Sequence, residues 1–188
     1  MTKRKLIVYI ATSADGYIAR SDDDLEWLQQ VAREGEDYGY AAFIQSIDTV
    51  VLGRRTYEKV LQMGVVPHTD KRCFVLSAAD GWRVPPNAPP TTQVYGGNLE
   101  SFIAQLKAEN SEKHIFCDGG AQVIQQLLRL QLIDEMIVSV IPVLLGSGIA
   151  LFQNAAALPE NTLLLLQCSA FESGLVQLHY RIKKNDAS

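Results

Sequence analysis

The sequence predicts a three-layer α/β protein with a mostly parallel central sheet and a C-terminal antiparallel hairpin. Apolar runs of strand length alternate with one-sided helical patterns through the first two-thirds of the 188 residues. This alternation is typical of parallel sheets that are covered by helices on both faces. Two apolar segments, about 162–171 and 175–183, flank Ser173-Gly174 and predict the hairpin. We therefore expect one domain over residues 1–188.

The expected strands are read from apolar runs that end in turn-forming residues. Leu6–Ala11 is uninterrupted, which indicates a central strand buried on both faces. Further parallel strands are expected at Thr49–Leu52, Arg72–Leu76, Thr92–Tyr95, His114–Cys117 and Met136–Ile141.

Two of the expected helix starts carry capping residues. Glu26 follows Asp23 by three residues, which is the spacing of a capping box. Asn98 precedes apolar residues spaced three and four apart, so it is expected to cap the helix that follows. Further helices are expected at about Asp37–Gln45, after Gly53 and after Gly120.

The composition excludes several classes of function. The chain is 47% hydrophobic and 20% charged, with a formal net charge of −4, so no broad basic surface for nucleic acid or membrane is expected. No apolar stretch approaches the about 20 residues that span a bilayer, and no secretory signal pattern opens the chain. Three dispersed cysteines lack metal-ligand spacing and are expected to be reduced. These features indicate a soluble cytoplasmic protein without a metal site.

Three expected strands end in glycine or a small polar residue: Gly53, Ser77 and Gly119-Gly120. In an open α/β sheet, ligands bind at the carboxyl ends of the strands. Glycine allows close approach of a ligand, and the first N–H groups of the next helix suit a phosphate. Arg54 and Arg55 follow Gly53 and could bind a terminal phosphate through paired donors. The alternatives are a simple tight turn and a solvated helix start.

Asp15 and Asp24 near the exit of the first strand are the candidate catalytic carboxylates. Asp24 could pair with the amidine-like edge of a heterocycle, although a helix-capping role is the alternative. Trp27 and Tyr57 could stack on the ring of a substrate or could belong to the core. The three histidines are dispersed, which argues against a metal centre or a catalytic triad. No dinucleotide fingerprint of the G-x-G-x-x-G type and no P-loop follows a strand.

Seven segments, taken in chain order, carry a resemblance to a known family. They are Ser13–Ala19, Asp24–Leu28, Leu52–Glu58, Asp118–Ala121, Leu132–Glu135, Pro142–Gly148 and Leu151-Phe152. Together they resemble the dihydrofolate reductase superfamily. They are most similar to bacterial stand-alone relatives of the C-terminal reductase domain of the riboflavin-biosynthesis deaminase/reductase, and the resemblance covers nearly the whole chain. It implies a three-layer dihydrofolate reductase-like fold.

The resemblance implies NADPH binding and hydride transfer to a pteridine-like or ribosylaminopyrimidine-like small molecule, as in 5-amino-6-(5-phosphoribosylamino)uracil reductases. A weak dihydrofolate reductase and a dinucleotide-binding protein without turnover are the alternatives. The implied contacts are Ala11, Ile18 and Ala19 for the nicotinamide; Gly53, Arg54, Arg55, Thr56 and Ser77 for the adenosine phosphates; and Gly119, Gly120, Ala121, Gln122 and Val123 for the pyrophosphate.

The resemblance also implies roles for single residues. The peptide between Gly119 and Gly120 is expected to be cis, which is rare without proline. Asp24 would orient the substrate with Trp27 beside it, and water or Asp15 would deliver the proton.

The sequence departs from the family pattern in three respects. Ala78 follows Ser77 where many relatives place an arginine beside the 2′-phosphate. No zinc deaminase motif is present, and Arg54–Glu58 does not reproduce the aspartate-rich substrate segment of the riboflavin enzymes. The natural substrate is therefore not inherited from the resemblance. The resemblance also implies a homodimer that pairs through the sheet, and the apolar strand Met136–Ile141 is compatible with it.

Overall fold

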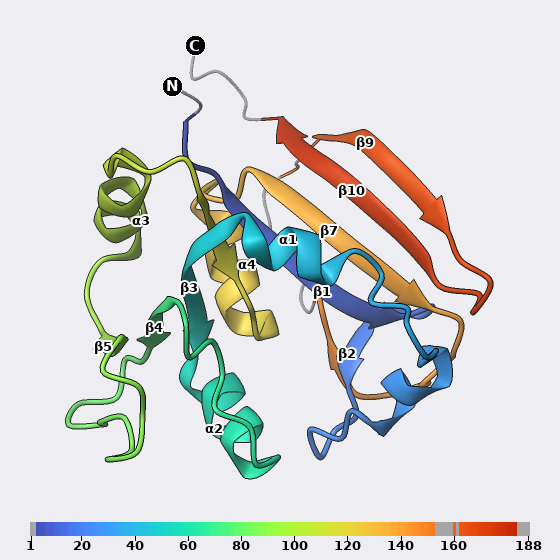
Figure 1. The fold of residues 1–188 in the computed structure, drawn as a ribbon, viewed down its shortest axis with the longest axis horizontal. Coiled ribbons are helices and arrows are strands. Elements are labelled where there is room, and N and C mark those ends of the chain that lie inside the picture. Colours follow the sequence, from blue (N-terminus) through green and yellow to red (C-terminus); the bar gives the residue numbers. More distant parts are fainter. Residues whose placement is uncertain (1–2, 153–159, 161, 184–188) are drawn as a thin grey trace.

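The computed structural model of the protein describes residues 3–152, 160 and 162–183. Its centre is an eight-stranded sheet with the order β5-β4-β3-β6-β1-β7-β10-β9 (Figure 1). These strands are β1 (Leu6–Ser13), β3 (Ile47–Gly53), β4 (Arg72–Leu76), β5 (Thr92–Tyr95), β6 (His114–Cys117), β7 (Glu135–Ile141), β9 (Thr162–Ala170) and β10 (Val176–Lys183). A small second sheet pairs β2 (Tyr17–Ala19) with β8 (Ile149–Ala150).

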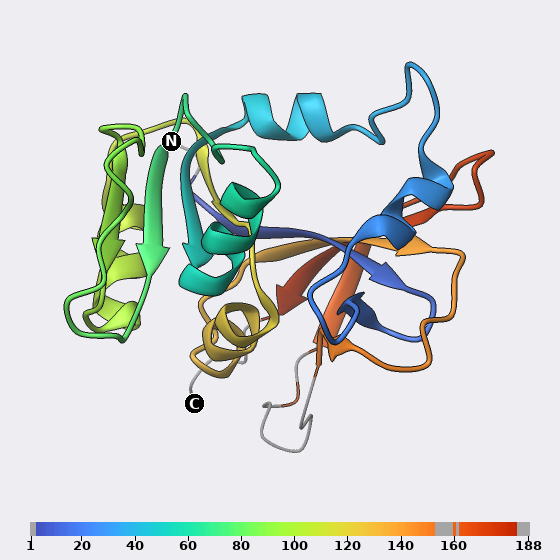
Figure 2. The same cartoon turned by 90° about the horizontal axis from the view of Figure 1, so that it is seen from below.

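The main sheet is parallel from β5 to β7, and β10 is antiparallel to both β7 and β9. The helices are η1 (Glu26–Val31, a 3-10 helix), α1 (Tyr40–Gln45), α2 (Arg54–Gln62), α3 (Leu99–Ala108) and α4 (Ala121–Arg129). Figure 2 shows α1 on one side of the sheet and α4 on the other. The predicted fold class, with its C-terminal antiparallel hairpin, is confirmed. Within the described part of the chain, no helix has the length and apolarity needed to cross a bilayer.

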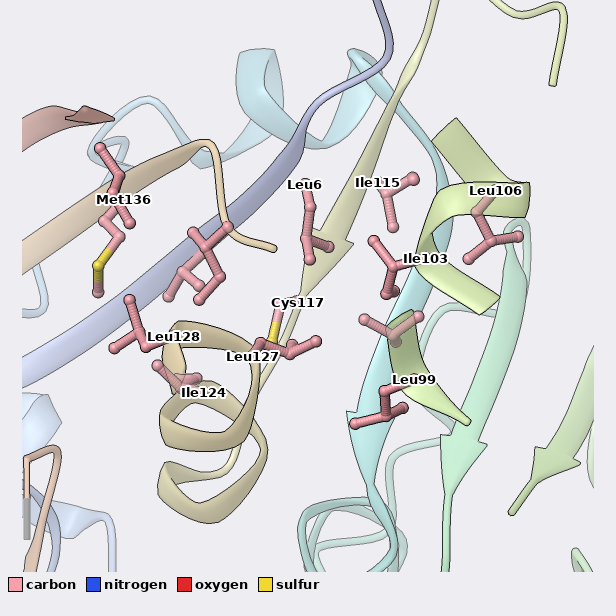
Figure 3. Packing of buried hydrophobic residues seen from close by; sticks show 14 of the residues in the cluster. Leu6, Leu99, Ile103, Leu106, Ile115, Cys117, Ile124, Leu127, Leu128 and Met136 are labelled. Atoms are coloured by element: carbon pink, nitrogen blue, oxygen red, sulfur yellow. The ribbon is translucent and has the colours of Figure 1, made fainter. Parts of the chain in front are cut away.

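The core lies on both faces of the sheet, because successive side chains of a strand point to opposite faces. Leu6 and Val8 of β1 belong to the cluster that includes α3 and α4, part of which Figure 3 shows. Ile7 belongs to the opposite cluster, together with Phe43 of α1 and Tyr57 of α2. Both faces of β1 are therefore buried, as its uninterrupted apolar sequence predicts.

Local capping agrees with the prediction at α3 but not at η1. The Asn98 side chain accepts a hydrogen bond from the Ser101 N–H at 2.9 Å and caps α3. The predicted capping box of Asp23 and Glu26 is wrong. Asp23 has a φ of 64° and binds an arginine of α2, and it is Asp24 that accepts a hydrogen bond from the Glu26 N–H at 3.2 Å.

The small sheet of β2 and β8 was not predicted, because its strands are too short to show a periodic pattern. It depends on Gly148, which has a φ of 148°. A Cβ atom at this position would lie 2.3 Å from the Ala19 carbonyl oxygen. The close contact fixes the chain that leaves β2 against the turn before β8.

Candidate functional site

Two glycine turns meet at the carboxyl ends of neighbouring strands. β3 ends at Gly53 and β6 is followed by Gly119-Gly120, and the Gly53 N–H donates a hydrogen bond to the Gly119 carbonyl at 2.7 Å. The peptide between Gly119 and Gly120 is cis, as the resemblance implies. The shared crevice that was inferred from the sequence is therefore present.

A cavity of about 740 Å³, here called the first cavity, opens at these turns. Helices α2 and α4 both begin at its wall, so their first N–H groups lie beside it. Ten predicted cofactor residues line it: Ala19, Gly53, Arg54, Arg55, Thr56, Ser77, Gly120, Ala121, Gln122 and Val123.

The two turns approach each other so closely that a Cβ atom at either glycine would crowd a neighbouring side chain. A Cβ atom on Gly120 would lie 2.9 Å from Thr56 Oγ1, and one on Gly53 would lie 3.0 Å from Val123 Cγ2. Side chains at these positions would press on the cavity wall. The glycines therefore leave backbone N–H groups accessible to a ligand, which is the arrangement that suits a pyrophosphate.

Three cations line the first cavity. Arg54 Nε lies 3.8 Å from a carboxylate oxygen of Glu58, and Arg55 Nη2 lies 2.6 Å from Asp23 Oδ2. Lys59, one helical turn further along α2, is the third, and the sequence analysis missed it. Lys59 follows Arg54 and Arg55 by five and four residues on the same helix, so its side chain lies near theirs, and this spacing could have indicated it.

The far end of the first cavity contains a second glycine pair, Gly96-Gly97, after β5. A Cβ atom on Gly96 would lie 2.8 Å from the Ser77 carbonyl oxygen. Tyr95, which also lines the cavity, stacks on Phe102 with ring centroids 3.8 Å apart. Ala78 also lines this end, and it occupies the position at which the family pattern would place an arginine. The sequence analysis assigned no role to this glycine pair, although its position after a parallel strand matches that of Gly119-Gly120.

A second cavity, of about 220 Å³, lies between η1, α1 and the strands β1 and β7. Ala11, predicted beside the nicotinamide, lines this cavity instead of the first. Its full lining is Tyr9, Ala11, Leu28, Val31, Ala32, Asp37, Tyr38, Tyr40, Ser139, Ile141 and Leu175.

Hydrogen bonds connect the polar groups of the second cavity. The Tyr9 hydroxyl donates to the Tyr38 carbonyl at 3.0 Å. The Gln177 amide donates to the Tyr9 oxygen at 2.8 Å and to Ser139 Oγ at 3.1 Å. Burial raises the pKa of Tyr9, and burial with the nearby carboxylate of Asp118 raises the pKa of another wall residue, Tyr40, to about 12. Both phenols are therefore neutral at physiological pH.

Asp15 and Asp24, the predicted catalytic carboxylates, are absent from the described linings of both cavities. Asp15 accepts hydrogen bonds from the N–H groups of Leu145 and Gly146 and from Ser13 Oγ, and the serine contact is the main cause of its lowered pKa. Asp24 contacts Arg20 at 3.1 Å. These contacts give both carboxylates structural roles, and their catalytic roles stay predictions.

The aromatic residues predicted to stack on substrate lie in the core, the alternative that the sequence left open. Trp27 is 2% exposed and Tyr57 is fully buried. Ile18, predicted at the nicotinamide, packs half-buried against the core cluster of α3 and α4. The indole N–H of Trp27 has no hydrogen-bond partner among the described residues, and the ring packs with Val31 and Ile141 of the second cavity wall.

A histidine–carboxylate pair, unpredicted from the sequence, lies next to the glycine turn. His68 Nε2 is 2.7 Å from Asp118 Oδ2, and the imidazole packs edge-on against Phe116. Asp118 directly precedes Gly119-Gly120. The two partners are 50 residues apart in the chain, so no local pattern announces the pair.

Comparison with known proteins agrees with this architecture. Residues 83–177 match the family described as the RibD C-terminal domain. The chain is 40% identical to the uncharacterized protein YwjB of Bacillus subtilis, over 95% of this chain and 98% of that protein. A crystal structure from Shewanella sp. PV-4, named after riboflavin biosynthesis, is 33% identical with a TM-score of 0.85, covering 96% of this chain and 99% of that one.

The fold extends to a more distant enzyme. Dihydrofolate reductase from Enterococcus faecalis, complexed with NADP(H), has a TM-score of 0.58 and 16% identity, over 96% of this chain and 97% of that one. At this identity the likeness concerns the fold alone. The chain belongs to the RibD C-terminal domain family and has the dihydrofolate reductase-like fold of reductases.

Proposed function

We propose that the protein is an NADPH-dependent reductase that acts on a small heterocyclic compound. The observation that carries this proposal is the hydrogen bond between Gly53 and Gly119, which joins two helix-initiating glycine turns beside one cationic cavity. The chain's family and the NADP(H) complex of a protein with the same fold support it.

The lining of the first cavity fits a phosphorylated dinucleotide. The turn at Gly119-Gly120 and the start of α4 would hold the pyrophosphate, since a Cβ atom on Gly120 would collide with Thr56. Arg54 and Arg55 would bind the adenosine phosphates, with Ser77 close by. When bound, the cofactor supplies a hydride.

The second cavity is the proposed substrate site. β1 pairs with β6 only as far as Val8 and Cys117, whereas its pairing with β7 continues to Ser13. The sheet therefore opens between β1 and β6, with Ala11 on the second cavity and Gly120 on the first. A nicotinamide in this opening would face a ring held in the second cavity.

Water is the proposed proton source. Asp15 accepts three hydrogen bonds, and its lowered pKa makes it a poor acid near neutral pH. The chain's contribution is to position the two reactants and to exclude bulk water from the space between them.

Binding measurements with NADPH and NADH test the proposal. Charge-assisted hydrogen bonds contribute about 1.5–3 kcal/mol, so Arg54→Ala should raise the Kd for NADPH about tenfold and change that for NADH little. Arg129→Ala, in the last turn of α4 and outside the described lining, is the matched control. Equal losses for both cofactors would contradict the 2′-phosphate assignment, and absence of any thermal shift with NADPH would refute the cofactor site.

Turnover assays separate the alternatives. Loss of NADPH absorbance with dihydrofolate would favour a weak dihydrofolate reductase. Cofactor binding without oxidation by any pteridine or aminopyrimidine would favour a dinucleotide-binding protein.

We also propose a homodimer that pairs through β9. This strand is at the edge of the sheet, has no charged residue over Thr162–Ala170, and exposes Leu163, Leu164, Leu165 and Leu166 by 38–50%. Native proteins cover or charge such edges, because they attract other strands. Met136–Ile141, which the sequence analysis found compatible with this contact, is within β7 between β1 and β10 and has no free edge.

A further inference from the structure

The two cavities differ in charge. Arg54, Arg55 and Lys59 line the first cavity. Among the described residues that line the second cavity, none is a lysine, arginine or histidine, and Asp37 is the only charged one. A phosphate group would therefore find cationic partners in the first cavity and a carboxylate in the second.

The negative charge of Asp37 is held in place. Its two carboxylate oxygens accept hydrogen bonds from the N–H groups of Gly39 and Ala41, both at 2.9 Å, at the start of α1. These bonds hold the pKa of Asp37 below its usual range. The surrounding segment 33–37 carries three carboxylates and one guanidinium, and that guanidinium, of Arg33, donates to the carbonyl of the preceding residue at 2.9 Å.

The other polar groups of the second cavity are neutral. Tyr9, Tyr40 and Ser139 present hydroxyl groups, which both donate and accept hydrogen bonds. Leu28 and Ile141 contribute apolar wall. This combination suits the flat faces and hydrogen-bonding edge of a heteroaromatic ring.

Size adds a second constraint. At about 220 Å³ the second cavity is smaller than the roughly 300 Å³ at which pockets for drug-sized ligands begin. A compound of one or two rings fits this volume. A ring with an attached sugar phosphate would exceed this volume, and Asp37 is the charged residue of the described wall that it would meet.

We propose that the second cavity binds a neutral or cationic heteroaromatic ring without a phosphate group and discriminates against its phosphate esters. This proposal rests on the proposed function for the role of the ring as hydride acceptor. It departs from the phosphoribosyl compound that the family resemblance implies, and it leaves recognition of phosphate to the cofactor cavity.

Calorimetric titration of the full chain tests the proposal without turnover. The probes are 6-hydroxymethylpterin and its diphosphate ester, which share a ring and differ in charge. Saturating NADP⁺ occupies the first cavity, so that its cations do not capture the ester. We expect the unesterified ring to bind at least tenfold more tightly than the ester.

Two variants assign the discrimination to one residue. Asp37→Asn keeps an oxygen that caps α1 but removes the charge, and it should reduce the preference for the unesterified ring at least threefold. Glu34→Gln removes an acidic charge that is outside the described lining and should leave the preference unchanged. Equal or tighter binding of the ester by the wild type, or no binding of either probe, would overturn the proposal. Failure to bind NADP⁺ counts against the proposed reductase alone, because the ratio between ring and ester can also be measured without cofactor in a variant in which Arg54, Arg55 and Lys59 are all replaced by alanine.

Discussion

Replacing Arg4 by methionine should destabilise the fold more than the removal of any exposed charged side chain. The residue is 2% exposed, and its guanidinium binds Asp48, Glu109 at 2.6 Å, and the carbonyl groups of Leu106 and Lys113 at 2.8 and 3.0 Å. It therefore ties the start of the chain to β3, to the end of α3 and to the chain before β6. Methionine retains most of the apolar stem but none of the donors.

The magnitude follows from what the substitution leaves behind. Removing one partner of a buried ion pair costs about 3–5 kcal/mol, because the remaining charges are uncompensated. The Asp48 and Glu109 side chains are 33% exposed, so water can solvate part of each carboxylate and the lower value applies. We expect a loss of about 3 kcal/mol and, at 2–4 °C per kcal/mol, a fall in Tm of about 6–12 °C.

Urea unfolding followed by circular dichroism measures this loss, and Arg72→Met is the matched control. Arg72 also binds Glu109, at 3.0 Å, but it is 46% exposed, so its removal should cost less than about 1 kcal/mol. A loss below 1 kcal/mol for the Arg4 variant, or equal losses for both variants, would refute the view that burial gives this network its strength.

Three further predictions follow from single contacts. Burial alone would raise the pKa of Glu135, but hydrogen bonds from Lys5 and His179 hold this pKa below its usual range. The charged Glu135 therefore stabilises the fold above about pH 4.3, and this stabilisation is lost as the pH falls. Glu135→Gln should therefore be less stable than the wild type at pH 7 by urea unfolding, with a difference that shrinks on acidification; a constant difference would contradict this. Gly148→Ala should lower Tm by several degrees, because a Cβ atom would lie 2.3 Å from the Ala19 carbonyl oxygen, and an unchanged Tm would show that the turn relaxes freely. Leu164→Lys should give a monomer in sedimentation velocity where the wild type is a dimer, and a persistent dimer would exclude β9 as the interface.

Most of the sheet could be predicted because its strands are marked by local composition. The apolar run at Leu6 and the periodic residues after Asn98 both give the observed elements. A helix was expected after Asp23 and η1 is found there, but the contact of Asp23 with Arg55 of α2, 32 positions away, could not be predicted. Tertiary contacts of this kind have no signature in local sequence.

The same difference between local sequence signals and tertiary contacts applies to the candidate site. Gly53 and Gly120 could be placed from sequence, because a glycine between a strand and a helix indicates a turn wherever it occurs. The lining of the second cavity could not, since Tyr9, Asp37 and Ser139 come from β1, the chain before α1, and β7. Asp24 was chosen for its position near the exit of the first strand and for its family match, and only the three-dimensional structure shows that Asp37 lines the second cavity.

The sheet topology separates the first cavity, proposed to bind phosphate groups, from the second cavity, proposed to bind the substrate ring. The cations and glycine turns come from the segments that follow β3 and β6, whereas the tyrosines and Asp37 lie on or beside β1 and β7. Between these groups, β1 leaves β6 after Val8 and continues along β7. A ligand that bridges the two cavities must cross this opening, so the proposed cofactor would reach the second cavity with the end that lacks phosphate groups. Residues around the second cavity could therefore change without altering the proposed cofactor site.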